Sequence, residues 1–214
     1  MENGEIDVIL LHETFLTTGK KVRIAGYNAY TPPQIGTDKG LATLVRTTIN
    51  TTGLHNPIPC CTNVETLAIT VTLLTQKVDI YNIYRKINWE DTRVLQLTQL
   101  IAHAERTPTL IFGDFNAHHP ILSSQSMTNP SGEHIAFASE DFEGVALLNT
   151  TYTLKRKQTR YTFLTTAVRH LTKWRVQATL ISDHFATVTE LEIQQLPQIP
   201  LPPPRWNQDL ADWV

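Results

Sequence analysis

The chain has 214 residues, of which 41% are hydrophobic and 18% are charged, and a chain of this size can bury a full core within one domain. Its formal net charge is −2, so it has no overall attraction for polyanions, and any contact with nucleic acid must come from local basic patches. The two cysteines, Cys60 and Cys61, are adjacent, which excludes a disulfide framework or a zinc knuckle. No apolar run approaches the roughly 20 residues that span a bilayer, so a soluble domain with no membrane partner is expected.

The first half of the chain is expected to consist mainly of β-strands. Residues 7–11 form a continuous apolar run that predicts a strand buried on both faces, with Glu13 just beyond its end. Around Leu67, apolar residues alternate with small polar ones in the two-residue period of a half-buried strand. Strands are predicted at residues 26–30, 41–45, 67–73 and 78–84, the last two at the spacing of a hairpin.

The hydrophobic period then changes to that of a helix. Asn88 resembles an N-cap, and apolar residues follow at helical spacing, which predicts a helix over about residues 89–106. This helix leads into a buried strand at residues 109–112, bounded by Pro108 and Gly113, so part of the sheet should receive a helix on its face. The remaining predicted elements are a helix near 134–143 and strands at 144–148, 175–181 and 185–191.

The C-terminal residues differ in composition from the rest. Five of the twelve prolines lie in residues 197–204, which predicts an extended, semi-rigid linker. We therefore assign residues 1–193 to one domain, 194–204 to a linker and 205–214 to the start of a following segment. The acidic, polar N-terminus does not resemble a signal peptide, so an intracellular location is expected.

Three predicted strands end in polar side chains. Glu13 follows the first strand, Asp114 and Asn116 follow the strand at 109–112, and Asp183 with His184 lies between the last two strands. Strand ends hold side chains on a rigid backbone while the loop leaves them accessible, so ligands and catalytic groups gather there. Carboxylate and amide oxygens suit Mg²⁺, an acid can orient water, and a histidine can oppose charge that develops on phosphate. The set indicates metal-assisted phosphoester hydrolysis.

The other histidines are expected to have structural positions and not to form a metal site. His118, His119 and His134 do not follow the regular spacing of a zinc site with four Cys or His ligands, so positions at the surface or the rim of the site are expected. His12 should point away from Glu13 if the strand continues, which favours a core or rim position over metal ligation.

The order of these motifs resembles that of the endonuclease/exonuclease/phosphatase superfamily. The motifs are Glu13-Thr14, Tyr84, the run from Gly113 to His119, and the run from Ser182 to Phe185. They are most similar to the apurinic-type endonuclease domains of insect and other arthropod non-LTR retrotransposons, over residues 7–191. Arg205-Trp206-Asn207 also resembles the segment that joins such a domain to a following reverse transcriptase, which implies a longer polyprotein.

The resemblance implies a fold, a cofactor and a partner. The fold would be a four-layered α/β sandwich, with two packed mixed β-sheets flanked by helices and the site where the sheets meet. Glu13 would be a ligand of Mg²⁺, or Mn²⁺, and Asp183 a second metal or site carboxylate. DNA would be the substrate, and a functional protein would act in the nucleus.

The resemblance also implies roles for four further residues. Asp114 would orient or deprotonate the attacking water, and Asn116 would hold the phosphate or that aspartate. His184 would donate to a phosphate oxygen in the pentacovalent transition state. Tyr84 matches a tyrosine that contacts the phosphate, although Arg85-Lys86 follows where relatives usually have a proline.

Two departures from the family pattern bear on activity. Relatives begin with a further strand whose asparagine supports the metal site, so an N-terminally truncated domain is expected. They also carry an aspartate that orients the catalytic histidine, whereas residues 161–166 contain no acid. Three functions therefore stay open: a Mg²⁺-dependent endonuclease that nicks DNA and leaves a 3′-hydroxyl primer, a catalytically inactive vestigial domain with weak DNA binding, and another phosphoesterase of the same superfamily.

Overall fold

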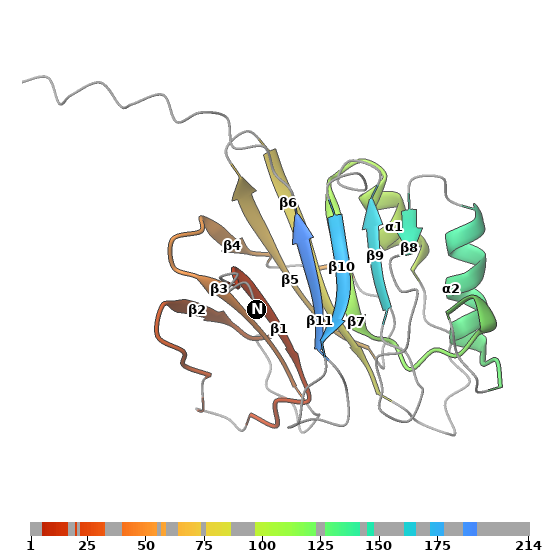
Figure 1. Cartoon of the computed structure of the whole chain (residues 1–214), viewed down its shortest axis with the longest axis horizontal. Helices are drawn as coiled ribbons and strands as arrows, with labels where there is room; N and C mark the ends of the chain where they lie inside the picture. The colour runs from red at the N-terminus through yellow and green to blue at the C-terminus, as the bar shows by residue number, and fades with distance from the viewer. Residues whose placement is uncertain are drawn as a thin grey trace, which may run out of the picture.

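The computed structural model describes residues 6–16, 20, 22–32, 40–54, 57–58, 64–73, 76–86, 97–122, 127–141, 145–147, 161–165, 172–177 and 186–191. Within these ranges the chain forms β-sheets of three, six and two strands and two α-helices (Figure 1). The predicted N-cap Asn88, the linker at 194–204 and the segment at 205–214 lie outside the described residues.

The N-terminal sheet is antiparallel, with strands in the order β1-β3-β2. It consists of β1 (Val8–His12), β2 (Tyr27–Tyr30) and β3 (Leu41–Arg46), and all three confirm predicted strands. The prediction that the first strand is buried on both faces is wrong, because β1 is half-buried along its whole length. It stands at the end of the strand order and pairs only with β3 within the described structure, so its apolar run is covered less completely.

The second sheet has six strands in the order β4-β5-β6-β7-β9-β8. β6 (Gln76–Arg85) forms the predicted antiparallel hairpin with β5 (Val64–Leu73) and pairs in parallel with β7 (Thr109–Asp114). The parallel strands are joined through α1 (Thr98–Ala104), as a parallel crossover requires. The other members are β4 (Thr51–Gly53), β8 (Val145–Leu147) and β9 (Tyr161–Thr165), each antiparallel to its neighbours.

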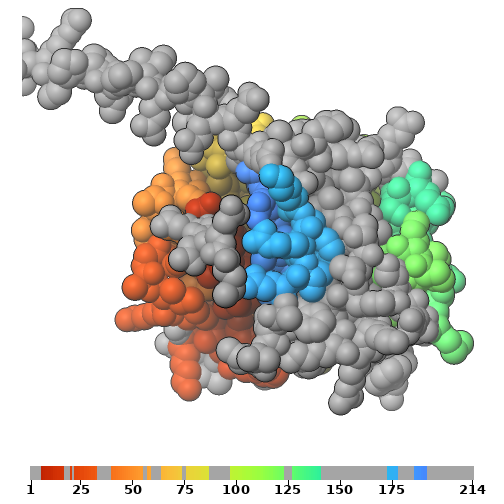
Figure 2. Space-filling model, viewed as in Figure 1, coloured from red at the N-terminus to blue at the C-terminus, as the bar shows by residue number. Residues whose placement is uncertain are grey.

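The last described strands form an antiparallel pair, β10 (Thr172–Gln177) with β11 (Ala186–Leu191). Leu191 packs against the same hydrophobic cluster as Val8 and Leu10 of β1. In Figure 2 the blue atoms of this pair accordingly lie beside the red atoms of the N-terminal strands. The pair therefore extends the layer formed by the N-terminal sheet.

The six-stranded sheet is covered on both faces. Side chains alternate along each strand, so Ile80 of β6 packs toward the N-terminal sheet while Tyr81 packs toward the helices. α1 and α2 (Pro130–Asp141) lie on the side of the sheet away from the N-terminal strands (Figure 1). Sheet on sheet with helices on an outer face is the α/β sandwich that the resemblance implies.

The two described helices confirm the predictions only in part. The C-terminal half of the first predicted helix is α1, whereas residues 87–96 lie outside the description. α2 begins at Pro130 rather than near residue 134. The Asn129 side chain accepts a hydrogen bond from the Gly132 backbone N–H at 2.8 Å, and proline is favoured at the first helical position, so the helix starts earlier. Neither helix is long and apolar enough to cross a membrane.

A buried asparagine links the two facing sheets. Asn82 of β6 is fully buried, and its Nδ2 lies within 3.4 Å of the Leu11 carbonyl and 3.2 Å of the Ala42 carbonyl. Because a buried amide without partners is costly, these contacts favour one relative position of the sheets. Leu11 lies two residues before Glu13, and Asn82 two before Tyr84, so the link stands next to the predicted site.

Gly113 permits a close approach between β6 and β7. A Cβ atom at this position would lie 2.2 Å from the Ile83 carbonyl oxygen, a distance that real structures do not tolerate. Ile83 is the register partner of Gly113, and Tyr84 is that of Asp114. Gly113 therefore fixes the spacing between β6 and β7 immediately before Asp114.

We predict that Gly113→Ala lowers the free energy of unfolding by about 1–3 kcal/mol, the usual cost of overpacking in a rigid core. Gly53→Ala on β4 is the matched control, because its Cβ would meet the Tyr30 ring at an ordinary 3.6 Å. Urea unfolding of both variants measures the difference. Equal stability of the two variants would contradict the close approach.

Candidate active site

The central contact of the predicted site joins the two sheets. The Tyr84 hydroxyl on β6 donates a hydrogen bond of 2.7 Å to Glu13 Oε1, just beyond the end of β1. Tyr84 is only 2% exposed, whereas Glu13 is half-buried. One carboxylate oxygen of Glu13 is thus held from within the protein, at the place where the sheets meet.

Carboxylates gather around this tyrosine. Glu65, Tyr84 and Asp114 are register partners on β5, β6 and β7, so their side chains leave the sheet on the same face. Burial raises the pKa of Tyr84 far above its usual range, and so do the hydrogen bond to Glu13 and the negative charges of Glu13, Asp114 and Glu65. Tyr84 therefore stays protonated and acts as a donor, not as a base.

The loop after β7 places an amide beside Asp114. Asn116 has a left-handed φ of 47°, and its backbone N–H donates to Asp114 Oδ1 at 3.2 Å. Its side-chain Nδ2 donates to the Arg85 carbonyl at 2.5 Å. Asparagine is among the non-glycine residues that adopt this conformation most readily, and its two hydrogen bonds hold it there. Both predicted residues of the Gly-Asp-Phe-Asn run are therefore fixed by the loop.

Asn129 is a supporting residue that the sequence analysis missed. Its Oδ1 accepts from the His118 N–H at 3.0 Å in addition to capping α2, and its Nδ2 donates to the Asn116 carbonyl at 2.9 Å. The side chain thus ties the loop after Asp114 to the start of α2. An Asn-Pro pair before a helix is a detectable N-cap signal, but the contact with the distant loop leaves no trace in the sequence.

Two half-buried histidines, His12 and His118, lie near Tyr84 and Asp114. The His118 side chain is half-buried, and burial lowers its pKa while the nearby negative charge of Asp114 acts in the opposite direction. The His12 ring lies 6.3 Å from the Tyr84 ring, measured between centroids. His134 is instead involved in packing, because its Nε2 accepts from the Leu97 N–H at 3.4 Å and burial lowers its pKa.

Four predicted site residues, Glu13, Tyr84, Asp114 and Asn116, are described and converge on this place. Asp183 and His184 lie outside the described residues. Among the side chains that are described, no group of three or more His, Cys, Asp or Glu could hold a metal ion. The half-buried carboxylate of Glu13 still fits Mg²⁺, which commonly binds one or two protein carboxylates and keeps several waters.

Comparison with protein families gives one match. A family described as endonuclease-reverse transcriptase matches residues 78–188, just over half of the chain. The matched region begins in β6, includes Tyr84, Asp114 and Asn116, and ends in β11. A comparison with curated protein sequences finds no match.

Solved structures of low sequence identity share the fold. The endonuclease domain of TRAS1, a telomere-specific non-LTR retrotransposon, has a TM-score of 0.60 at 17% identity, over 80% of this chain and 83% of that one. The catalytic domain of human Nocturnin gives 0.57 at 17% identity, over 86% and 80%. The 3′-5′ exonuclease NExo from Neisseria meningitidis gives 0.54 at 18% identity, over 89% and 91%.

We predict that Asn129→Ala lowers the free energy of unfolding by about 1–3 kcal/mol, because it removes a helix cap and leaves the His118 N–H without its acceptor. Asn129→Asp keeps both acceptor roles and should retain most of that stability. Hydrogen exchange reports the same difference, with faster exchange at His118 and Gly132 in the alanine variant only. Unchanged exchange in Asn129→Ala would contradict the supporting role.

Proposed function

The chain belongs to the endonuclease-reverse transcriptase family, within the endonuclease/exonuclease/phosphatase superfamily, and on that premise we propose that it is a Mg²⁺-dependent DNA endonuclease. The reaction would be hydrolysis of one phosphodiester bond to nick a target strand. The observation that carries the proposal is the convergence of Glu13, Tyr84 and Asp114 from three strands of two sheets. Such an assembly requires both sheets to be packed together and is not a local turn.

Asp114 is the residue proposed to act on water. It is 5% exposed and stands at the end of a buried strand, so its position is fixed before substrate binds. It would accept a proton from the attacking water as the water oxygen bonds to phosphorus. The P–O3′ bond then breaks, and the departing oxygen takes a proton from solvent water to become the 3′-hydroxyl.

Asn116 and Tyr84 are proposed to keep the carboxylates in place. Asn116 donates its backbone N–H to Asp114, which limits rotation of that carboxylate. Tyr84 donates to Glu13 Oε1, which fixes the orientation of that carboxylate. Contact of Tyr84 with the phosphate stays a prediction.

Glu13 is the proposed ligand of Mg²⁺, and Asp183 is proposed as a second site carboxylate. When bound, the ion would neutralise charge that develops on the phosphoryl oxygens. Glu13 is suited to this role because its hydrogen bond with Tyr84 orients the carboxylate, and partners of this kind commonly strengthen metal binding. His184 is proposed to donate to a phosphate oxygen.

DNA is the proposed substrate because the matching family is described as endonuclease-reverse transcriptase. A protein of similar fold is the endonuclease domain of a non-LTR retrotransposon. A 3′-hydroxyl at the nick would prime a reverse transcriptase domain in the same polyprotein. The second candidate is a domain that binds DNA but does not cleave it, and the observation that favours it is the absence of an acid in residues 161–166.

Nicking of supercoiled plasmid in Mg²⁺ tests the proposal. We expect relaxed circles that a DNA polymerase extends without prior phosphatase treatment, because the nick carries a 3′-hydroxyl. Asp114→Asn should reduce the nicking rate by about 10²–10⁴-fold, the usual contribution of a general base.

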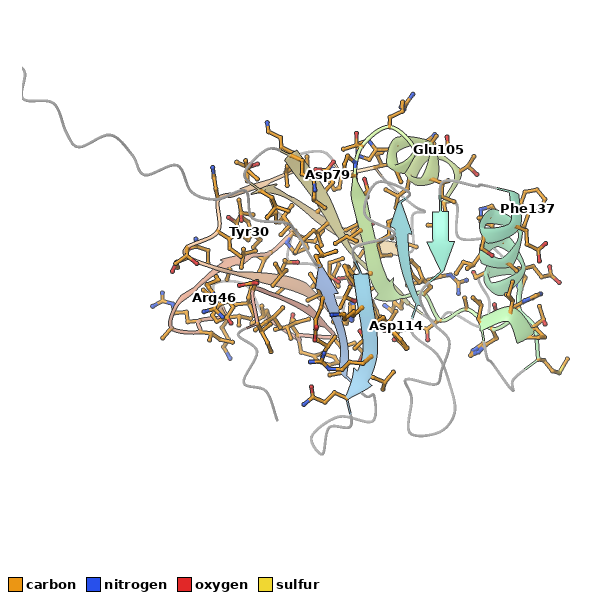
Figure 3. The ribbon with its side chains drawn as sticks, turned by 45° about the horizontal axis from the view of Figure 1, so that its top comes forward. Tyr30, Arg46, Asp79, Glu105, Asp114 and Phe137 are labelled. Carbon is orange, nitrogen blue, oxygen red and sulfur yellow. The ribbon has the colours of Figure 1, made fainter. Side chains whose placement is uncertain are left out.

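Glu105→Gln is the matched control, because this carboxylate lies at the end of α1, far from Asp114 (Figure 3). It should nick at the wild-type rate. DNA binding without any nicking by the wild-type protein would favour the inactive domain. Nicking that survives Asp114→Asn would remove Asp114 from the mechanism.

A further inference from the structure

An exposed aromatic residue, Phe15, follows the proposed metal ligand closely in the chain. Phe15 follows Glu13 by two residues and is 64% exposed, although phenylalanine usually contributes to the core. Two residues of extended chain span at most about 7 Å, so the two Cα atoms are no farther apart than this. Phe15 is thus part of the loop that carries Glu13.

The backbone of this loop is strained. Glu13 has a φ of 51° and Phe15 a φ of 48°, both in the left-handed region. A bulky side chain rarely adopts this conformation, because its Cβ then lies close to the backbone. Strain of this kind gathers at binding and catalytic sites, where the position of a side chain matters more than stability.

Contacts with a neighbouring loop hold the strained conformation. The Thr14 N–H donates to the Gly40 carbonyl at 3.1 Å, and the Gly40 N–H donates to Glu65 Oε1 at 3.4 Å. Gly40 has a φ of 80°, which favours glycine, and a Cβ there would lie 2.8 Å from Thr14 Oγ1. The loop is therefore fixed to β5, and Phe15 is presented from a rigid support.

The position of Phe15 relative to Glu13 limits which part of a DNA substrate its ring would contact. Successive phosphates of one DNA strand rise about 3.4 Å along the helix axis and lie farther apart than this through space, so 7 Å corresponds to about one to two nucleotide steps. A phosphate held beside Glu13 and Asp114 would bring its neighbouring nucleotides within reach of Phe15. Bases have apolar faces that stack on aromatic side chains, whereas phosphates interact mainly with charged and polar groups.

We infer that Phe15 is a DNA contact that stacks on, or wedges beside, a base within about two nucleotides of the scissile phosphate. The inference rests on the proposed function, since it requires DNA at the site. It assigns to Phe15 a part in binding and in the choice of nicking position, and no part in the chemical step. The contrasting interpretation is an ordinary exposed side chain, which is common on protein surfaces.

Fluorescence anisotropy with labelled duplex DNA in EDTA tests the inference without cleavage. Phe15→Ala should weaken binding about 5- to 100-fold, the usual effect of removing an aromatic platform, and Phe15→Trp should restore it. The dependence of log affinity on log salt should keep its slope, because no phosphate contact is lost. Phe137→Ala is the matched control, since Phe137 is 61% exposed on α2, away from Asp114 (Figure 3).

Phe15→Gly separates binding from folding. Glycine relieves the left-handed strain, so this variant should unfold at a temperature equal to or above that of the wild-type protein, yet bind DNA as weakly as Phe15→Ala. Wild-type nicking and DNA affinity that both survive Phe15→Gly would overturn this inference alone. A wild-type protein that neither binds nor nicks DNA would overturn the proposed function and this inference together.

Discussion

The site depends on the hydrogen bond between Tyr84 and Glu13, because it joins a strand of each sheet at the point where the carboxylates meet. Two residues earlier on both strands, Asn82 reaches the Leu11 carbonyl. The two contacts are two residues apart on both chain segments, and together they oppose sliding of one sheet over the other. Hydrophobic packing between the sheets is not directional, so polar contacts of this kind determine which residues face each other.

A second constraint acts through the backbone. Gly113 lets β7 approach β6, and Gly132 lets the start of α2 approach the loop at His118, where a Cβ would lie 2.0 Å from the carbonyl oxygen. Asn129 then connects that helix to the loop behind Asp114. The carboxylate of Asp114 therefore has support from the sheet on one side and from a helix on the other.

Much of the architecture follows from local patterns. Alternating and continuous apolar runs predicted the strands around β5, β6 and β7, and polar residues after strand ends predicted Glu13, Asp114 and Asn116. The degree of burial of β1 was not predictable in the same way, because burial depends on which strands lie beside it. The parts played by Asn82 and Asn129 also escaped prediction, since a buried asparagine differs from a surface one only through distant partners. The left-handed conformation of Phe15 has no signal in its residue type.

The central claim is that Tyr84 prepares Glu13 to bind a divalent ion, and the binding of Mn²⁺ to the wild-type protein and to Tyr84→Phe, followed by titration calorimetry, tests it most directly. Phenylalanine retains the packing of the ring and removes only the donor, so the protein should stay folded with a loss of stability of about 1–3 kcal/mol. The account predicts binding by the wild-type protein that becomes about 10-fold weaker in the variant. Equal affinity for Mn²⁺ in the two proteins would contradict it.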